Sequence, residues 1–227
     1  MRPHIIYLHG FGSSARSAKG LAVGARLRQR IASYAIPDLE AGDFFNLTMD
    51  GIFARAEAAA RALPDDGAPL VVIGSSLGGY SAAMLAAQRR LPRLVGLVLI
   101  APAFRFTDHW RERLGEAGVA AWRARGSMDF YHHGAERELP LGIAFHQSCL
   151  ALPGIPGDPG VPVAIIHGRH DETVDWHASL AYAEVNPGVE LHLVVGDHRL
   201  TEPRHEELIV ACAIDLMGRA DPTHGQG

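Results

Sequence analysis

The sequence is poor in cysteine, and this scarcity excludes a disulfide framework. Its 227 residues include two cysteines, Cys149 and Cys212, which are far apart and lack the spacing of metal ligands. Cys212 lies in the apolar, helix-like segment LIVACAIDLM. We therefore expect two free thiols in the core, as in proteins of a reducing compartment, and a cytoplasmic location.

Long hydrophobic runs are also missing. No stretch reaches the roughly 18 apolar residues that a membrane-spanning helix needs. The first apolar run, IIYL, is too short for the core of a signal peptide, and no small-residue cleavage site follows it. The sequence therefore predicts neither a membrane span nor a secretion signal.

Neither sign of charge is concentrated along the chain. The formal net charge is -4, and of the 21 basic residues only Lys19 is a lysine, which we attribute to coding bias rather than to chemistry. Because there is no basic stripe, we do not expect a nucleic-acid partner. The adjacent histidines His132 and His133 are expected in a solvated loop, since such a pair rarely holds a metal alone. We expect neither a metal nor a cofactor.

Short apolar runs alternate with helical patterns along the chain. Strands are expected over residues 4–10, 33–39, 69–76, 94–103, 162–168 and 189–196. Helices are expected over residues 15–31, 48–63, 77–90, 175–185 and 203–218. Continuous apolar strands that alternate with helices predict a parallel sheet with helices on both faces. We expect one α/β domain over residues 1–218, followed by a disordered tail over 219–227.

One segment, residues 103–160, interrupts this alternation. It separates two strands by far more than a typical connection and contains helical pieces and a Gly/Pro run, LPGIPGDPG. Long excursions of this kind are typical of lids or binding inserts. Most aromatic residues of the insert are expected to pack it onto the sheet, and one or two to touch a substrate. The candidates are Phe104, Trp110 and Phe145.

A serine lies between glycines in the stretch GSSLGGY. Gly74, Ser76 and Gly78 fit the pattern G-x-S-x-G, directly after a predicted strand and at the start of a predicted helix. In that context the turn is so tight that small flanking residues must relieve clashes, and the serine stands exposed as a nucleophile. A purely structural glycine turn is the alternative. Ser75 is the rival hydroxyl, but its spacing to the glycines is wrong.

A serine nucleophile needs a base, because its hydroxyl is hardly ionised near neutral pH. His198, in the stretch VVGDHRL, follows the last predicted strand, where a base paired with such a serine is expected. His192 and His205 are competitors. The first lies inside the strand pattern and the second inside the last helix, so neither stands at the carboxyl end of a strand.

The base in turn needs an acid that sets its tautomer and stabilises the imidazolium ion. Asp171, in IIHGRHDETVDWH, lies on the loop after the preceding strand. The alternative is an aspartate that only caps a helix. Glu172 and Asp175 also remain possible, although Asp175 has the position of an N-cap. Chain order and placement favour Asp171.

A tetrahedral intermediate needs two backbone N–H donors for its oxyanion. Leu77, at the start of the helix after Ser76, supplies one. The loop LHGFGSS after the first strand supplies the other, and we assign it to Phe11 because the flanking glycines let the backbone approach a substrate closely. This loop matches neither the Walker nor the dinucleotide-binding pattern.

Four stretches together resemble one family: HGFGSS, GSSLGGY, HGRHDETV and GDHRL. They are similar to those of the α/β-hydrolase fold superfamily. More narrowly, they resemble the YqiA-like bacterial serine esterases and the mitochondrial abhydrolase-domain acyl-protein thioesterases and acyl-glucuronide esterases. The resemblance runs from His4 to about Met217. It implies a compact α/β-hydrolase fold with a six-stranded, mostly parallel sheet and a small helical lid insert. It departs from the full fold because the first antiparallel strands are missing.

The resemblance also implies the roles of the site residues. Ser76 is then the nucleophile, His198 the base and Asp171 the acid, with Phe11 and Leu77 as oxyanion donors. The expected activity is hydrolysis of small carboxylic esters or thioesters through an acyl-enzyme. A thioesterase for acylated proteins or acyl-CoA, an acyltransferase, a carbon–carbon bond hydrolase and a non-catalytic binding protein of the same fold are the alternatives.

Overall fold

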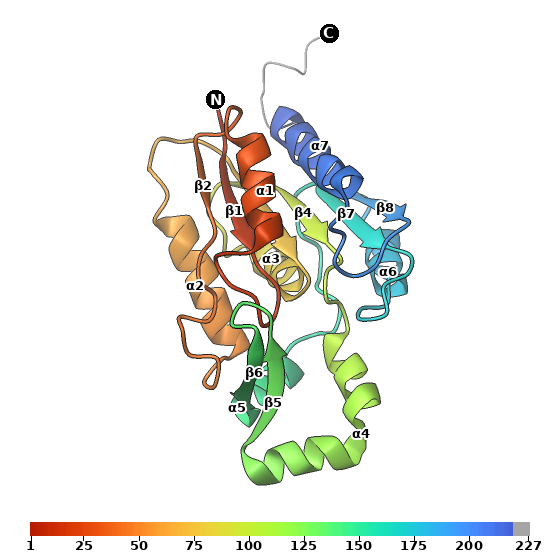
Figure 1. Ribbon diagram of the computed structural model, residues 1–227. Helices are drawn as coiled ribbons and strands as arrows, with labels where there is room; N and C mark the ends of the chain where they lie inside the picture. Colours follow the sequence, from red (N-terminus) through yellow and green to blue (C-terminus); the bar gives the residue numbers. More distant parts are fainter. Residues whose placement is uncertain (220–227) are drawn as a thin grey trace.

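A six-stranded parallel sheet lies at the centre of the computed structural model, which describes residues 1–219 (Figure 1). The strand order is β2-β1-β3-β4-β7-β8. The strands are β1 (His4–Leu8), β2 (Ser33–Ala35), β3 (Leu70–Ser75), β4 (Leu94–Ile100), β7 (Val163–Gly168) and β8 (Val189–Val194). The predicted fold class is therefore confirmed, and every pairing in this sheet is parallel.

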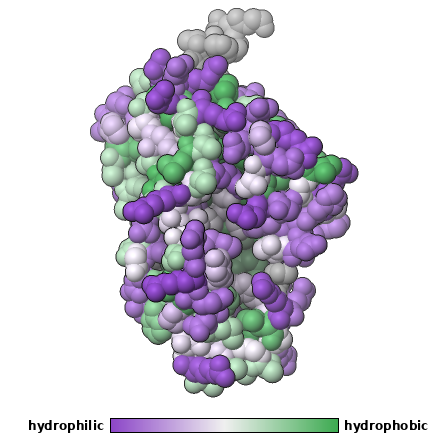
Figure 2. Space-filling view, viewed as in Figure 1, coloured by the Kyte–Doolittle hydropathy of each residue, from purple (hydrophilic) through white to green (hydrophobic). Residues whose placement is uncertain are grey.

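Helices cover both faces of the sheet. One face carries α1 (Ala18–Leu27) and α7 (Pro203–Arg219), which pack against each other in front of the sheet in Figure 1. The other face carries α2 (Met49–Arg61), α3 (Leu77–Ala87) and α6 (His177–Val185). Polar side chains cover most of the surface in the view of Figure 2, and hydrophobic ones are scattered.

Alternate residues of each central strand enter two separate cores. In β3, Leu70 and Val72 join the core under α2 and α3, whereas Val71 and Ile73 join the core under α1 and α7. The same alternation holds in β1, β4 and β7. Successive side chains of a strand point to opposite faces, so strands buried on both sides are apolar throughout. This explains why the sequence shows continuous apolar runs.

The strands end at a common edge of the sheet. Leu8 of β1 lies beside Gly74 of β3. Gly168 of β7 lies beside Val194 of β8. The loops after β1, β3, β7 and β8 therefore leave from one edge, which is where sites form on parallel sheets.

The insert between β4 and β7 is partly helical, as predicted. It contains α4 (Phe106–Arg125) and α5 (Ile143–Leu150). It also contains an antiparallel hairpin that the sequence pattern did not indicate, formed by β5 (Ser127–His132) and β6 (Arg137–Gly142). Two glycines in positive φ shape α4: Gly115 (φ 64°) breaks the helix, and Gly126 (φ 77°) ends it.

The second strand is shorter than predicted. β2 ends at Ala35 rather than at residue 39. Pro37 has no N–H for the strand ladder, and the Leu39 N–H donates to His9 Nε2 at 3.3 Å instead. The chain thus leaves the sheet early and brings Leu39 and its neighbour Glu40 to the loop after β1.

Three further sequence predictions concern the chain as a whole. Cys149 and Cys212 are buried free thiols, as predicted. No helix within residues 1–219 has the length and apolar character needed to cross a bilayer. The tail predicted over 219–227 lies outside the described residues, apart from Arg219 at the end of α7.

Candidate active site

Ser76 lies on a strained turn between β3 and α3. Its backbone has φ 52° and ψ -117°, a conformation that residues with a side chain rarely adopt. Two glycines make the turn possible. A Cβ at Gly74 would lie 2.5 Å from the Gly78 carbonyl oxygen, and a Cβ at Gly78 would overlap the Leu8 carbonyl oxygen. The turn leaves the Ser76 side chain half-buried at the sheet edge.

His198 reaches Ser76 from the loop after β8. Its Nε2 lies 3.1 Å from Ser76 Oγ, and its side chain is 21% exposed. The preceding Asp197 shapes the loop, since its carboxylate accepts the N–H groups of Arg199 and Leu200. Asp197 therefore acts on the turn, and His198 faces the serine.

Asp171 lies on the other side of His198, on the loop after β7. Its Oδ2 accepts a hydrogen bond from His198 Nδ1 at 2.7 Å, and its side chain has no exposed surface. Its Oδ1 accepts the N–H groups of Thr173 and Val174, both at 2.8 Å. Burial acts to raise the pKa of Asp171, but the hydrogen bonds from His167 and His198 outweigh it and hold the pKa well below its usual value.

The alternative residues lie elsewhere. His192 faces Cys212, with 3.6 Å between Nε2 and Sγ. His205 is buried in α7 and lies against the Val195 carbonyl oxygen. Asp175 binds the backbone and ring of His177 near the start of α6, and Glu172 is exposed. The structure thus brings Ser76, His198 and Asp171 into one chain of hydrogen bonds.

The two predicted oxyanion donors are both near Ser76. Leu77 follows it in the chain, and Phe11 lies on a loop that passes close to it. Leu77 is the first residue of α3, and the first N–H groups of a helix have no partner within it. Gly10, which precedes Phe11, is so close that a Cβ there would lie 3.3 Å from Ser76 Cβ. The loop after β1 therefore approaches Ser76, as predicted.

His9 is a residue of this loop that the sequence analysis did not assign. Its Nδ1 donates to the Gly10 carbonyl oxygen at 3.0 Å, and its Nε2 accepts from Leu39. Burial lowers the pKa of His9, which keeps the ring neutral for this pattern. Because the C=O and N–H of a trans peptide point in opposite directions, the bond to Gly10 turns the Phe11 N–H away from the His9 ring. The sequence signal that could have identified His9 is its position directly before Gly10, the first glycine of the loop.

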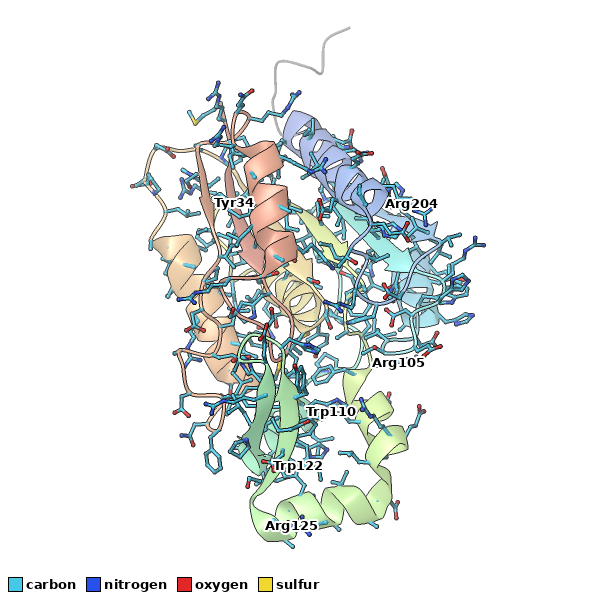
Figure 3. The ribbon with its side chains drawn as sticks, in the orientation of Figure 1. Tyr34, Arg105, Trp110, Trp122, Arg125 and Arg204 are labelled. Atoms are coloured by element: carbon cyan, nitrogen blue, oxygen red, sulfur yellow. The ribbon has the colours of Figure 1, made fainter. Side chains whose placement is uncertain are left out.

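The Phe11 ring lies in a cluster of aromatic rings that joins the insert to the sheet. Its centroid is 5.6 Å from that of Trp110, 5.4 Å from Phe145 and 5.7 Å from Phe130. Figure 3 shows Trp110 and Trp122 pointing into the space between α4 and the hairpin. Phe104, the third candidate lid residue, packs instead against Tyr182 of α6, at 4.8 Å between centroids.

His133 is exposed in the turn between β5 and β6, as predicted, whereas the solvated-loop prediction is wrong for His132. His132 is buried in β5, and its Nε2 donates to Glu40 Oε2 at 2.6 Å, while its Nδ1 accepts from the Ala135 N–H. The hairpin also donates from the Gly134 N–H to the Gly12 carbonyl oxygen at 3.1 Å. The insert is thus attached directly to the loop that carries Phe11.

Glu40 is an unusual partner because its second oxygen has none. Oε1 is buried without a hydrogen bond, beside a cavity of about 10 Å³ that is also lined by His9 and Phe11. Burial raises the pKa of Glu40, and the hydrogen bond from His132 opposes this only in part. Folding therefore favours the protonated acid.

Replacing Glu40 with glutamine is expected to retain or raise stability at neutral pH. The stabilisation from the acid form is complete below the unfolded-state pKa of about 4.3 and is lost as pH rises through the higher folded-state pKa. Glutamine stays neutral, so the Tm of Glu40→Gln relative to wild type should increase between about pH 4 and pH 8. Glu138→Gln, an exposed site on β6, is the control. A pH-independent Tm difference would contradict this prediction.

The only lysine lies near the carboxylates of the site. Burial lowers the pKa of Lys19 to about 8, although Asp197, Glu206 and Asp171 favour its charged form. Lys19 lies in the first turn of α1 and interacts electrostatically with Asp197 and Arg199, the two neighbours of His198 in the chain. No sequence pattern around Lys19 indicated this placement.

Known proteins resemble this chain in sequence and in fold. The model of the uncharacterised protein family UPF0227 matches residues 4–211. The mitochondrial palmitoyl-protein thioesterase ABHD10 of Rattus norvegicus is 30% identical over 160 residues, which cover 66% of this chain and 52% of the relative. The Bos taurus protein is 24% identical over 230 residues and is covered to 74%. The chain thus matches about half the length of the rat relative.

Solved structures share the architecture at low sequence identity. The alpha/beta hydrolase domain-containing protein 10 from mouse has a TM-score of 0.81 and 22% identity, with 96% of this chain and 91% of that chain covered. Est1E from Butyrivibrio proteoclasticus has a TM-score of 0.72 and 20% identity, with 96% and 89% covered. These likenesses establish the fold, and the match over 4–211 establishes the family. The chain belongs to UPF0227 and has the fold of the α/β hydrolases.

Proposed function

We propose that this protein is a serine hydrolase that cleaves carboxylic ester or thioester bonds through an acyl-enzyme. The observation that carries this proposal is the hydrogen-bond chain from Ser76 Oγ through His198 to Asp171, with lengths of 3.1 and 2.7 Å. Ser76 is the nucleophile, His198 the general base and Asp171 the group that orients and stabilises its imidazolium form. The geometry supports each of these roles.

In the first half of the reaction, Ser76 Oγ attacks the carbonyl carbon while His198 Nε2 takes its proton. The carbonyl oxygen becomes an oxyanion that accepts hydrogen bonds from the N–H groups of Phe11 and Leu77. The carbon–oxygen or carbon–sulfur bond to the leaving group then breaks, and His198 Nε2 gives its proton to the departing alkoxide or thiolate, which leaves as the alcohol or thiol. In the second half, His198 Nε2 takes a proton from water, whose oxygen attacks the acyl carbon. The ester bond to Ser76 Oγ then breaks, His198 returns the proton to Ser76 Oγ, and the acid is released.

Esters and thioesters require few catalytic groups besides Ser76, His198 and Asp171. An alkoxide or thiolate leaving group needs only the proton held on His198, and water is the second substrate. We place the acyl group against the rings of Phe11, Trp110 and Phe145. These rings pack with centroids 5.4 to 5.6 Å apart, so we expect short acyl chains to react faster than long ones.

A thioesterase for long-chain acyl groups is the second candidate. The rat relative, 30% identical in the matched part, carries the name of a palmitoyl-protein thioesterase. Ser76, His198 and Asp171 would also serve that reaction. A long acyl chain would require the aromatic rings over Phe11 to separate.

We further propose that residues 1–218 act as one domain, with the insert over 103–160 contributing to substrate choice. We do not expect Phe104 to touch the acyl group, because its ring packs against Tyr182 rather than against Phe11. A cytoplasmic location stays a prediction from cysteine usage.

The test is a series of p-nitrophenyl esters from acetate to palmitate, run beside palmitoyl-CoA and an S-palmitoylated peptide. We expect Ser76-dependent hydrolysis, with kcat/KM falling as the ester acyl chain lengthens. A clear preference for the palmitoyl thioesters would select the second candidate. No hydrolysis of any compound, together with saturable binding of an ester, would replace both by a binding protein.

A further inference from the structure

Asp171 accepts hydrogen bonds from two histidines, of which the proposed mechanism uses one. Besides His198, the buried His167 lies with its Nε2 3.0 Å from the same carboxylate oxygen, Oδ2. The Nδ1 of His167 lies 2.8 Å from Ser179 Oγ on α6. A continuous chain therefore runs through five side chains: Ser76, His198, Asp171, His167 and Ser179.

The partners of His167 determine where its proton lies. Nε2 faces two acceptors, Asp171 Oδ2 and the Val174 carbonyl oxygen at 3.3 Å, so it must carry the hydrogen. Nδ1 lies 2.8 Å from the Ser179 hydroxyl, which can donate to it. The ring thus donates toward Asp171 from Nε2, and Ser179 fixes the orientation of the ring through Nδ1.

No ligand can reach this second histidine. His167 and Ser179 both have 0% exposed surface, and β7 and α6 enclose them. A second site of reaction is therefore ruled out for this pair, although it repeats the residue types of the first. Its influence on a substrate must pass through Asp171.

We infer that His167 is a positioning residue for acyl transfer, which holds the Asp171 carboxylate in the orientation that His198 requires. This inference rests on the proposed serine hydrolase function. Oδ1 is held by two backbone N–H groups and Oδ2 by two imidazoles, so all the directions of the carboxylate are occupied. Without His167, Oδ2 loses one of its two donors, so the carboxylate is held less firmly toward His198 Nδ1, and the imidazole is held less firmly toward Ser76.

Electrostatics supports the same role. Burial acts to raise the pKa of Asp171, and among the effects that lower it the hydrogen bond from His167 comes before that from His198. The acid must stay ionised while His198 carries a proton in the transition state. His167 therefore contributes to the charge of Asp171 as well as to its orientation.

A matched pair of amide variants separates positioning from packing. In His167→Gln the amide nitrogen can take the place of Nε2 and donate to Asp171. In His167→Asn the shorter amide takes the place of Nδ1, keeps Ser179 as partner and falls short of Asp171. We expect His167→Asn to lower kcat for a p-nitrophenyl ester about 10- to 100-fold with KM unchanged, and His167→Gln to retain most of kcat.

Two further readouts follow the same variants. The rate at which a fluorophosphonate labels Ser76 should fall in His167→Asn, and the downfield proton resonance of the His198–Asp171 hydrogen bond should shift or disappear. Equal loss of kcat in both folded variants, or no loss in His167→Asn, overturns the inference. If neither variant folds, Ser179→Ala decides: we expect lower kcat with unchanged KM, and unchanged kcat overturns the inference. Wild-type protein without Ser76-dependent turnover would instead refute the proposed function.

Discussion

Ser76→Ala is expected to lower kcat for ester hydrolysis by about 10⁵- to 10⁶-fold, to the level of the uncatalysed reaction plus the contribution of binding. The alanine has no oxygen to form the acyl-enzyme, and His198 is left without the partner that it holds at 3.1 Å. The fold should persist, because a methyl group fits the space of the half-buried side chain. Steady-state kinetics and covalent labelling by a fluorophosphonate measure the two effects.

The neighbouring serine supplies the control for this experiment. Ser75 is also half-buried, but it ends β3 and lies near the Tyr7 hydroxyl. Ser75→Ala should therefore leave kcat within a few fold of wild type and preserve labelling. If labelling survives in Ser76→Ala and disappears in Ser75→Ala, the nucleophile is Ser75 and the assignment of Ser76 is wrong.

The second large effect concerns stability rather than chemistry. Gly78→Ala is expected to destabilise the protein by more than about 4 kcal/mol, or to prevent folding. A Cβ at this position would overlap the carbonyl groups of Leu8 and His9, which are backbone atoms fixed by the sheet. The strand β1 and the helix α3 would have to separate, and this would also move Ser76.

Thermal unfolding measures this prediction directly. For a chain of this size, a loss of 4 kcal/mol corresponds to a fall in Tm of about 10 °C or more. Gly188→Ala is the control, since that glycine is exposed and has no atom within 4 Å of an added Cβ. Equal Tm values for the two variants would mean that β1 and α3 can move apart at little cost.

The fold was predictable from sequence because its causes are local. Each central strand is a short apolar run, since alternate residues enter cores on both faces of the sheet, and each run is followed by a helix. The placement of Ser76, His198 and Asp171 followed from chain order, because the carboxyl ends of parallel strands meet at one edge. Their chemical roles remain predictions.

The parts that escaped prediction depend on partners far away in the chain. Glu40 and His132 are separated by 92 positions and meet only because the insert folds back over the sheet. The adjacent histidines indicated a solvated loop, and no local pattern reveals that one of them is buried. His167 is different, because it lies near the end of β7, only four residues before Asp171. Its contact with Asp171 could therefore have been predicted from the sequence.

The hairpin bond to Gly12 has a consequence for how such proteins diversify. An insert that touched only substrate could be exchanged between relatives, altering selectivity while preserving turnover. Here the Gly134 N–H and the His132 ring hold the loop of Phe11 and its neighbour Glu40. A grafted insert would have to reproduce those attachments. Under the proposed function, we therefore expect selectivity and rate to change together whenever the insert changes.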